Sequence, residues 1–189
     1  TALFDGHDAA INIMRRLLQD QGAEVIHLGH NRSVEEIAQA VIQEDADAVA
    51  VSSYQGGHNE FFPYLIDRLA QLNAPQVQVF GGGGGVIVPD EIDALEAYGV
   101  NRIYTPEDGR KLGLEALIAD LLQRTAQHRR VRSLDDSPEL SQPGVLGATL
   151  SAVEWAAERG DVALSTYLKG LQSAKAIPVL GITGTGGAG

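Results

Sequence analysis

The sequence has no cysteine and few basic residues, and each shortage excludes a class of protein or site. Without cysteine there can be no disulfide and no thiolate metal centre, so a metal would need nitrogen or oxygen ligands. The sequence contains 14 Lys and Arg residues and 25 Asp and Glu residues. The resulting net charge of −11 argues against a nucleic-acid surface over most of the chain. No apolar run reaches the roughly 18 residues of a membrane span, and no signal peptide is visible. We therefore expect a cytoplasmic protein without a nucleic-acid or membrane partner.

Strand and helix patterns alternate five times along residues 1–127, with short connections between them. Apolar runs such as 48–52 are typical of buried parallel strands, and apolar residues spaced three and four apart are typical of helices that cover a sheet. The alternation predicts the α/β class, with a flavodoxin-like, doubly wound, parallel five-stranded sheet whose first strand is truncated. The expected strands are the one ending at 3–4, then 24–28, 48–52, 76–80 and 102–104; the expected helices are 9–21, one capped by Ser33, one containing 61–69, one from Asp90 to Gly99, and 107–127.

The chain changes character after residue 127. Residues 128–133 are basic, and the following stretch contains Pro138 and Pro143 and shows little periodicity. We expect the arginines here either to dock on an acidic neighbour in the full protein or to lie on a solvated tether. Three parts are therefore predicted: a domain at 1–127, a linker at 128–146, and a segment at 147–189 with helical pieces near 148–158 and 161–172 and a new strand at 177–183.

Both ends of the chain look cut. Thr1 to Phe4 resembles the end of a strand whose beginning is missing, and Gly189 ends the chain within a glycine-rich motif. We expect a segment of a longer polypeptide.

A histidine between two aspartates follows the first predicted strand. The right-handed crossover rule places all strand-to-helix loops of such a sheet on one edge, where ligands bind. A carboxylate that accepts the N–H of one ring nitrogen fixes the tautomer and raises the basicity of the other nitrogen for a metal. The alternative is an exposed loop histidine beside a helix-capping aspartate. Convergence with the other loops favours the ligand, and the residues predicted to meet there are Asp5, Gly6, His7, Asp8, Ser52, Ser53, Tyr54, Gly81, Gly82, Gly83, Gly84, Gly85, Tyr104, Thr105 and Pro106.

The serine and glycine loops each allow two interpretations. The hydroxyl groups of Ser52 and Ser53 can donate to a ligand nitrogen or cap the following turn. Five consecutive glycines lose much backbone entropy when they become ordered, which suits a backbone that a large flat group must approach closely, but such a run can also be a flexible loop. His58 is expected to cap or orient the third helix rather than to bind metal.

Taken together, these stretches resemble cobalamin-binding domains over about residues 1–127. Asp5-Gly6-His7 matches the opening of the D-x-H-x-x-G signature of that family, Ser52-Ser53-Tyr54 takes the place of its S-x-L, and the run from Gly81 to Gly85 takes the place of its glycine pair. Ala10 stands where the family has glycine, and Tyr54 where it has leucine. The details are most similar to fused isobutyryl-CoA mutases, which join a cobalamin domain, a small GTPase chaperone and a substrate barrel in one chain.

This resemblance implies adenosylcobalamin as the cofactor. His7 would replace the cofactor's own benzimidazole as the lower cobalt ligand, and Asp5 would hydrogen-bond the other His7 nitrogen. The displaced nucleotide tail would pass Ser52, Ser53 and the glycines. The parent chain would be a radical acyl-CoA mutase of the isobutyryl-CoA/butyryl-CoA type and a homodimer, with the acyl-CoA bound by a barrel outside this segment and no catalytic residue within it.

The last six residues form the start of a second motif. Gly184-Thr185-Gly186-Gly187-Ala188-Gly189 follows an apolar strand and matches the G-x-x-x-x-G opening of a P-loop. The candidate nucleotide-binding residues are Gly184, Gly187, Ala188 and Gly189. The domain order matches the fused mutases, so GTP and Mg²⁺ are expected in a GTPase domain of the parent chain. The lysine and the Ser or Thr of the motif would follow Gly189, so the segment alone is not expected to bind a nucleotide tightly.

Two other classes of function stay open at this point. A corrinoid methyl carrier uses the same ligand motif, although the partial P-loop disfavours it. A non-enzymatic flavodoxin-like signalling domain is the other class, but a receiver needs an aspartate at the end of its third strand, where this chain has Ser52.

Overall fold

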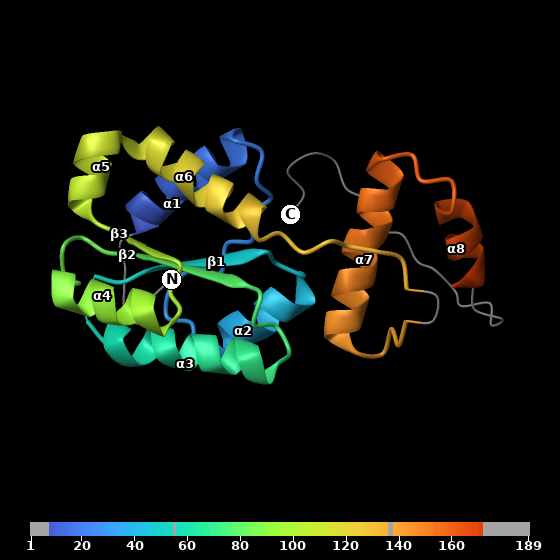
Figure 1. The fold of residues 1–189 in the computed structure, drawn as a ribbon, viewed down its shortest axis with the longest axis horizontal. Helices are drawn as coiled ribbons and strands as arrows, with labels where there is room; N and C mark the ends of the chain where they lie inside the picture. Colours follow the sequence, from blue (N-terminus) through green and yellow to red (C-terminus); the bar gives the residue numbers. More distant parts are fainter. Residues whose placement is uncertain (1–7, 55, 136–137, 172–189) are drawn as a thin grey trace, which may run out of the picture.

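The computed structural model describes residues 8–54, 56–135 and 138–171, which form a small parallel sheet covered by helices (Figure 1). The three strands are β1 (Ala48–Ser52), β2 (Gln78–Gly82) and β3 (Arg102–Tyr104). The eight helices of these residues are α1 (Asp8–Asp20), α2 (Val34–Gln43), α3 (His58–Gln71), α4 (Pro89–Tyr98), α5 (Pro106–Leu112), α6 (Leu114–Gln127), α7 (Pro143–Glu158) and α8 (Leu164–Gly170).

The strands are parallel and lie in the order β1-β2-β3. Their register places Ser52 beside Gly82 and Gly82 beside Tyr104. Helices α2, α3 and α4 cover one face of the sheet, and α1, α5 and α6 cover the other (Figure 1). The predicted α/β class and the doubly wound arrangement are therefore present, and the carboxyl ends of the three strands meet at one edge.

The prediction of five strands is not met in the part of the chain that the structure describes. The first predicted strand lies outside the described residues, and residues 24–28 are not a strand. A strand needs a neighbouring ladder for its backbone groups, and none of the three described strands pairs with 24–28. The fourth predicted strand, 76–80, is shifted by two residues, so that β2 ends within the glycine run.

Three predicted helices also differ from the structure. The predicted helix 107–127 is two helices, because Gly113 adopts a left-handed φ of 78° between α5 and α6, a conformation that favours glycine. Helix α7 begins at Pro143, inside the predicted linker, with proline in the first turn, where its missing N–H costs nothing. The helix predicted at 161–172 is the shorter α8.

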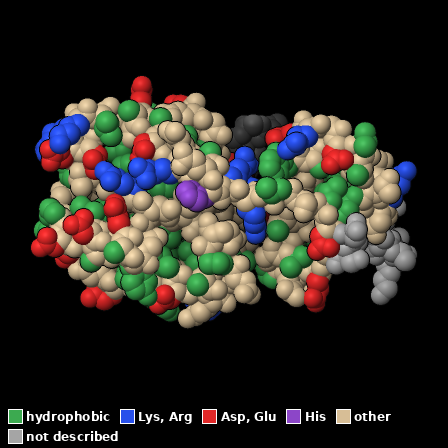
Figure 2. All heavy atoms as spheres, viewed as in Figure 1, with side chains coloured by type: hydrophobic (Ala, Val, Ile, Leu, Met, Phe, Trp, Pro, Cys, Tyr) green, Lys and Arg blue, Asp and Glu red, His purple; other side chains and the backbone are tan. Residues whose placement is uncertain are grey.

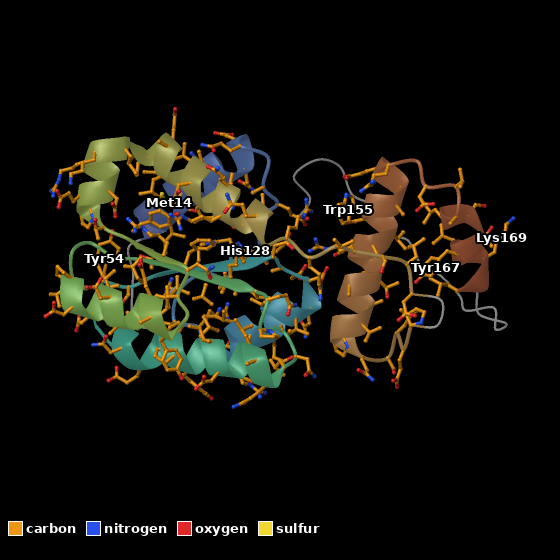
Figure 3. The ribbon with its side chains drawn as sticks, viewed as in Figure 1. Met14, Tyr54, His128, Trp155, Tyr167 and Lys169 are labelled. Atoms are coloured by element: carbon orange, nitrogen blue, oxygen red, sulfur yellow. The ribbon has the colours of Figure 1, made fainter. Side chains whose placement is uncertain are left out.

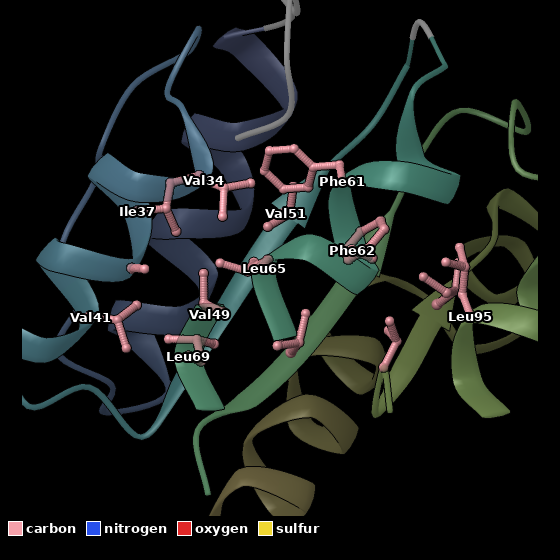
Figure 4. Packing of buried hydrophobic residues seen from close by; sticks show 14 of the residues in the cluster. Val34, Ile37, Val41, Val49, Val51, Phe61, Phe62, Leu65, Leu69 and Leu95 are labelled. Carbon is pink, nitrogen blue, oxygen red and sulfur yellow. The ribbon is translucent and has the colours of Figure 1, made fainter. Parts of the chain in front are cut away.

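The main core lies between β1, β2 and the helices α2, α3 and α4 (Figure 4). Ile37 of α2 and Phe62 and Leu65 of α3 have no exposed surface. Side chains of this size each stabilise the fold by about 1.5–3 kcal/mol when they are buried. A second cluster on the other face joins Phe80 and Tyr104 to α6. The strand ends that carry the candidate site are thus fixed from both faces.

The linker docks on the amino-terminal edge of the sheet. Arg132, only 7% exposed, donates to the carboxylates of Asp45 (2.7 Å) and Asp47 (2.9 Å), which lie just before β1. Arg129 pairs with Asp47 and Arg130 with Asp45. Basic side chains gather at this junction between the sheet and α7 (Figure 2). The linker arginines therefore dock on acidic residues of the same domain, and the solvated tether is the wrong alternative for this segment.

Helix α7 packs against α2 through small residues. A side-chain carbon at Gly147 would overlap the backbone carbonyl of Gln43, and one at Gly144 would lie 2.7 Å from Ile42 Cγ2. The guanidinium groups of Arg129 and Arg159 lie 5.3 and 5.5 Å from the Trp155 ring centre, within the range of cation–π contacts. Trp155 lies at the opposite end of the sheet from Tyr54 (Figure 3). Helix α7 therefore leaves the carboxyl edge of the sheet uncovered.

Candidate functional site

The loop after β1 begins with a serine whose hydroxyl is buried. Ser52 ends the strand and is half-buried, whereas Ser53 is 1% exposed. The backbone N–H of Ser53 donates to the Gly82 carbonyl at 2.7 Å, which continues the β1–β2 ladder past the last strand residue. Ser53 Oγ has no hydrogen-bond partner among residues 8–54, 56–135 and 138–171. A buried polar atom without a partner costs about 1–3 kcal/mol, so this hydroxyl is a candidate ligand contact.

The glycine run is held by packing against the neighbouring loop and core. Added side-chain carbons would overlap the side chains of Ile103 and Phe62 at Gly81, the Ser53 carbonyl oxygen at Gly83, and the Tyr54 ring at Gly84. These three glycines are therefore required by close approaches within the protein itself.

The other two glycines have different surroundings. An added carbon at Gly82 would make only an ordinary contact with the Tyr104 carbonyl oxygen, at 3.5 Å. Gly85 has a left-handed φ of 92°, and an added carbon there would lie 3.8 Å from Pro106 Cγ. The glycine loop thus touches both neighbouring loops, which are those of Ser53–Tyr54 and Pro106.

The side chains of Tyr104 and Thr105, at the end of β3, make contacts within the fold. The Tyr104 ring stacks on Phe80, and its hydroxyl donates to Asp120 Oδ2 on α6 at 2.8 Å. Burial and the Asp120 carboxylate raise the pKa of Tyr104 well above its usual range. Thr105 caps α5 by accepting from the Asp108 N–H. The structure therefore assigns the Tyr104 and Thr105 side chains to packing and capping, and it leaves the backbone and Pro106 beside the glycine loop.

A carboxylate that the sequence did not single out joins the first turns of α3 and α4. Glu91 Oε2 lies 2.9 Å from His58 Nε2 and accepts from the Val88 N–H at 3.0 Å. Glu91 Oε1 accepts from Asn59 Nδ2 at 2.8 Å. His58 is the first residue of α3, but the N-cap is Gly57 and no side chain caps the helix. The prediction that His58 caps α3 is therefore wrong, and its side chain instead contacts Glu91 of α4. A Glu three residues after the N-cap was the available signal, but Val88 lacks the hydroxyl that would have marked a capping box.

These hydrogen bonds hold the Glu91 carboxylate in its charged form. The Val88 N–H makes the largest contribution, followed by His58 and Asn59, and together they lower the pKa of Glu91 to about 2. The carboxylate therefore remains ionised over the whole physiological range of pH.

The remaining predicted site residues lie outside the described part of the chain. Asp5, Gly6 and His7 precede it, and the P-loop residues Gly184 to Gly189 follow it. Asp8 is the first residue of α1. Within residues 8–54, 56–135 and 138–171 no group of three or more His, Cys, Asp and Glu side chains can hold a metal ion. None of the helices described there is both long and apolar enough to cross a membrane.

The described edge fits a flat ligand that brings its own polar atoms. Three strand ends lie side by side, and a carbon added at Gly82 would meet only the Tyr104 carbonyl oxygen. The buried Ser53 hydroxyl lacks a hydrogen-bond partner among the described residues. A ligand that lies across this edge would supply the missing hydrogen bond. This is the position at which open α/β sheets bind their ligands.

Comparison with known proteins agrees with this location. Residues 1–105 match the family model described as B12 binding domain. The whole chain is 54% identical to the fused isobutyryl-CoA mutase of Cupriavidus metallidurans and 50% identical to that of Geobacillus kaustophilus, but it covers only 17% and 18% of those proteins. The 2-hydroxyisobutanoyl-CoA mutase small subunit of Aquincola tertiaricarbonis is 35% identical over 61% of this chain and 86% of the subunit. The chain thus spans less than a fifth of the fused mutases that it matches.

Proposed function

Because the chain belongs to the B12 binding domain family, we propose that the carboxyl edge of its sheet binds adenosylcobalamin with the nucleotide tail extended along Ser53 and the glycine loop. The bound cofactor supplies a cobalt–carbon bond whose homolysis starts radical chemistry. The role of this chain is to bind and orient the cofactor, and no catalytic residue is assigned to it.

The buried Ser53 hydroxyl is the observation that carries this proposal. It follows the last residue of β1, where the backbone still pairs with Gly82, and it has no hydrogen-bond partner in the part of the chain that the structure describes. The tail of cobalamin contains phosphate, ribose and benzimidazole groups, each of which offers polar atoms to a hydroxyl. Gly82 is half-buried, and its missing side chain would allow such a group to approach the strand ends closely.

We assign the lower cobalt ligand to His7, with Asp5 as its hydrogen-bond acceptor. Both residues directly precede α1 in the sequence, and α1 begins at Asp8 and packs against α6 on one face of the sheet. In a right-handed crossover the residues that lead into such a helix belong to the same edge as Ser53 and the glycine run. An Asp–His pair there would orient the imidazole for cobalt in the same way as carboxylate–histidine pairs orient metal ligands elsewhere.

The activity that we propose for the full-length protein is that of a radical acyl-CoA mutase. Support comes from the full-chain alignments with proteins named fused isobutyryl-CoA mutase, and from a further mutase subunit that aligns with the domain. These relatives favour the mutase over a methyl carrier. The proposal includes an acyl-CoA site outside this chain and a domain in the same protein that binds GTP and Mg²⁺, whose P-loop begins at Gly184. It also includes a homodimer and a cytoplasmic location.

The lower ligand can be tested by absorption spectroscopy of the full-length protein with bound cobalamin. His7→Ala should retain the fold and shift the spectrum to that of cobalamin without a histidine ligand. His30→Ala, a histidine variant in another loop, should retain the wild-type spectrum. An unchanged spectrum in His7→Ala, or a loss of the histidine-ligated spectrum in His30→Ala, would contradict the assignment.

A further inference from the structure

The carboxylate of Glu91 joins the two loops of the candidate site at the ends that lead into the helices. We propose that Glu91, His58 and Asn59, here called the loop clamp, hold the β1–α3 loop and the β2–α4 loop at the spacing that the nucleotide tail requires. The inference rests on the proposed function. These three residues are positioning residues: they hold the loops in place, and the tail itself contacts Ser53 and the glycine loop.

The loop clamp uses both oxygens of one carboxylate to bridge two helices. Glu91 belongs to the first turn of α4, and His58 and Asn59 begin α3. Because a carboxylate only accepts, the His58 proton of this bond lies on Nε2. Hydrogen bonds to a charged acceptor are roughly twice as strong as neutral ones. The His58 side chain is 5% exposed and that of Glu91 30%, so the bridge is partly shielded from water.

The backbone before His58 has little packing of its own. Gly56 and Gly57 both have left-handed φ angles, of 89° and 76°, and a side-chain carbon added at Gly56 would meet nothing within 4 Å. Two adjacent glycines with open space around at least one of them do not define a loop path by packing. Side-chain packing at Gly56 therefore does not fix the backbone that leads into His58.

The opposite ends of the two loops are already joined. The Ser53 N–H donates to the Gly82 carbonyl, and Gly83 and Gly84 lie against Ser53 and Tyr54. The loop clamp adds the second junction, so the loops are connected both where they leave the strands and where they enter the helices. Ser53 belongs to the first of these junctions, and a change at Glu91 is expected to alter the spacing of the two loops between that junction and the helices.

The test compares cobalamin with cobinamide, a corrinoid that lacks the nucleotide tail, on the full-length protein. Glu91→Ala should weaken cobalamin binding by about tenfold or more, and Asn59→Ala, which removes one exposed partner and leaves the α4 cap intact, by roughly threefold to fivefold. Cobinamide affinity should change less than about twofold in both variants. Asp93→Asn removes an exposed carboxylate from the same helix and should change neither affinity.

The outcomes separate the loop clamp from a purely structural contact. Equal loss of both corrinoids in Asn59→Ala, or cobalamin affinity equal to that of wild type in both clamp variants, would overturn the inference. If Glu91→Ala fails to fold, Asn59→Ala decides the question alone. A wild-type protein that binds no cobalamin would instead overturn the proposed function, and the loop clamp with it.

Discussion

Ser53 combines a cost to stability with a proposed use in binding. Its hydroxyl is enclosed at the sheet edge and makes no hydrogen bond in the structure. In the protein without cofactor this arrangement is unfavourable, because the desolvated oxygen gains nothing in return for the water that it has lost. In the proposed complex the same oxygen is already positioned, and the cost of removing it from solvent has already been met in the folded protein.

We predict that Ser53→Ala separates these two effects. The free energy of unfolding without cofactor should stay the same or rise by up to about 1 kcal/mol, because a buried unsatisfied group is removed. Cobalamin affinity should fall roughly fivefold to tenfold, which corresponds to about 1 kcal/mol. Urea unfolding and cobalamin titration measure the two quantities. Ser165→Ala on the exposed side of α8 is the control and should change neither; a clear loss of stability in Ser53→Ala would show that the hydroxyl has a structural partner.

Residues that end strands at the same edge of the sheet can have different roles in the structure. Ser52 ends β1 and Tyr104 ends β3, yet the Tyr104 hydroxyl donates a hydrogen bond to Asp120 and its ring belongs to the second core cluster. The position of Tyr104 in the sequence correctly predicted that it lies at the carboxyl edge of the sheet. It did not show which way the side chain turns, because this depends on α6, which begins ten residues later.

At the scale of elements, the linker and α7 are attached to the sheet by a buried ion-pair network. Arg132 lies 87 residues after Asp45 in the sequence, and the side chains of both are less than one tenth exposed. Arg132 Nη2 also donates to the Asp45 carbonyl at 2.8 Å. The network therefore fixes the linker to the turn between α2 and β1, and α7 continues from it onto α2.

Removing the buried Arg132 side chain from this network should destabilise the fold more than removing the exposed Arg129 side chain. Arg132→Met leaves the buried Asp45 carboxylate without its best-enclosed partner and should lower the free energy of unfolding by about 3 kcal/mol. Arg129→Met removes an arginine that is 52% exposed and should cost less than about 1 kcal/mol. Urea unfolding of both variants provides the comparison; equal effects would mean that Arg132 is no more important than a surface ion pair.

The elements also show where sequence patterns suffice. The apolar run at 48–52 gave the bounds of β1 correctly, because side-chain pattern and strand coincide there. The glycines at the end of β2 have no side chains and so give no apolar pattern. The predicted strand therefore began and ended two residues before β2. The break at Gly113 was missed because helical periodicity continues on both sides of it, and only the left-handed φ reveals the boundary.

At the scale of the whole molecule, depressed carboxylate pKa values predict sensitivity to acid. Hydrogen bonds from Arg68 and Gln39 lower the pKa of Glu35 to about 2, and the contacts of Glu91 lower its pKa to about 2 as well. A group with a lowered folded-state pKa stabilises the fold above its unfolded pKa of about 4.5, and this contribution is lost as the pH falls toward 2.

The double variant Glu35→Gln/Glu91→Gln tests this pH dependence. It should be less stable than wild type at pH 6, and the difference should shrink at about pH 3.5, where wild type is losing the same contribution. Denaturant unfolding at the two pH values measures it. A difference that stays constant or grows with acidity would show that these carboxylates do not govern acid unfolding.

The overall arrangement was predictable, but the contacts that complete the site were not. Alternating strands and helices specified the sheet edge and the loops that meet there, including Ser53 and the glycine run. The loop clamp joins residues 33 apart, and the linker network joins residues up to 87 apart. Pairings over such separations depend on how the helices pack, and a single sequence does not contain that information in any local pattern.

We propose that the carboxyl edge of the sheet holds the nucleotide tail of cobalamin. A crystal structure of the full-length protein with adenosylcobalamin is the decisive test. We predict a polar atom of the tail about 3 Å from Ser53 Oγ, with the tail beside Gly82 and His7 on the cobalt. A tail bound elsewhere, with Ser53 Oγ still unpartnered, would contradict the account.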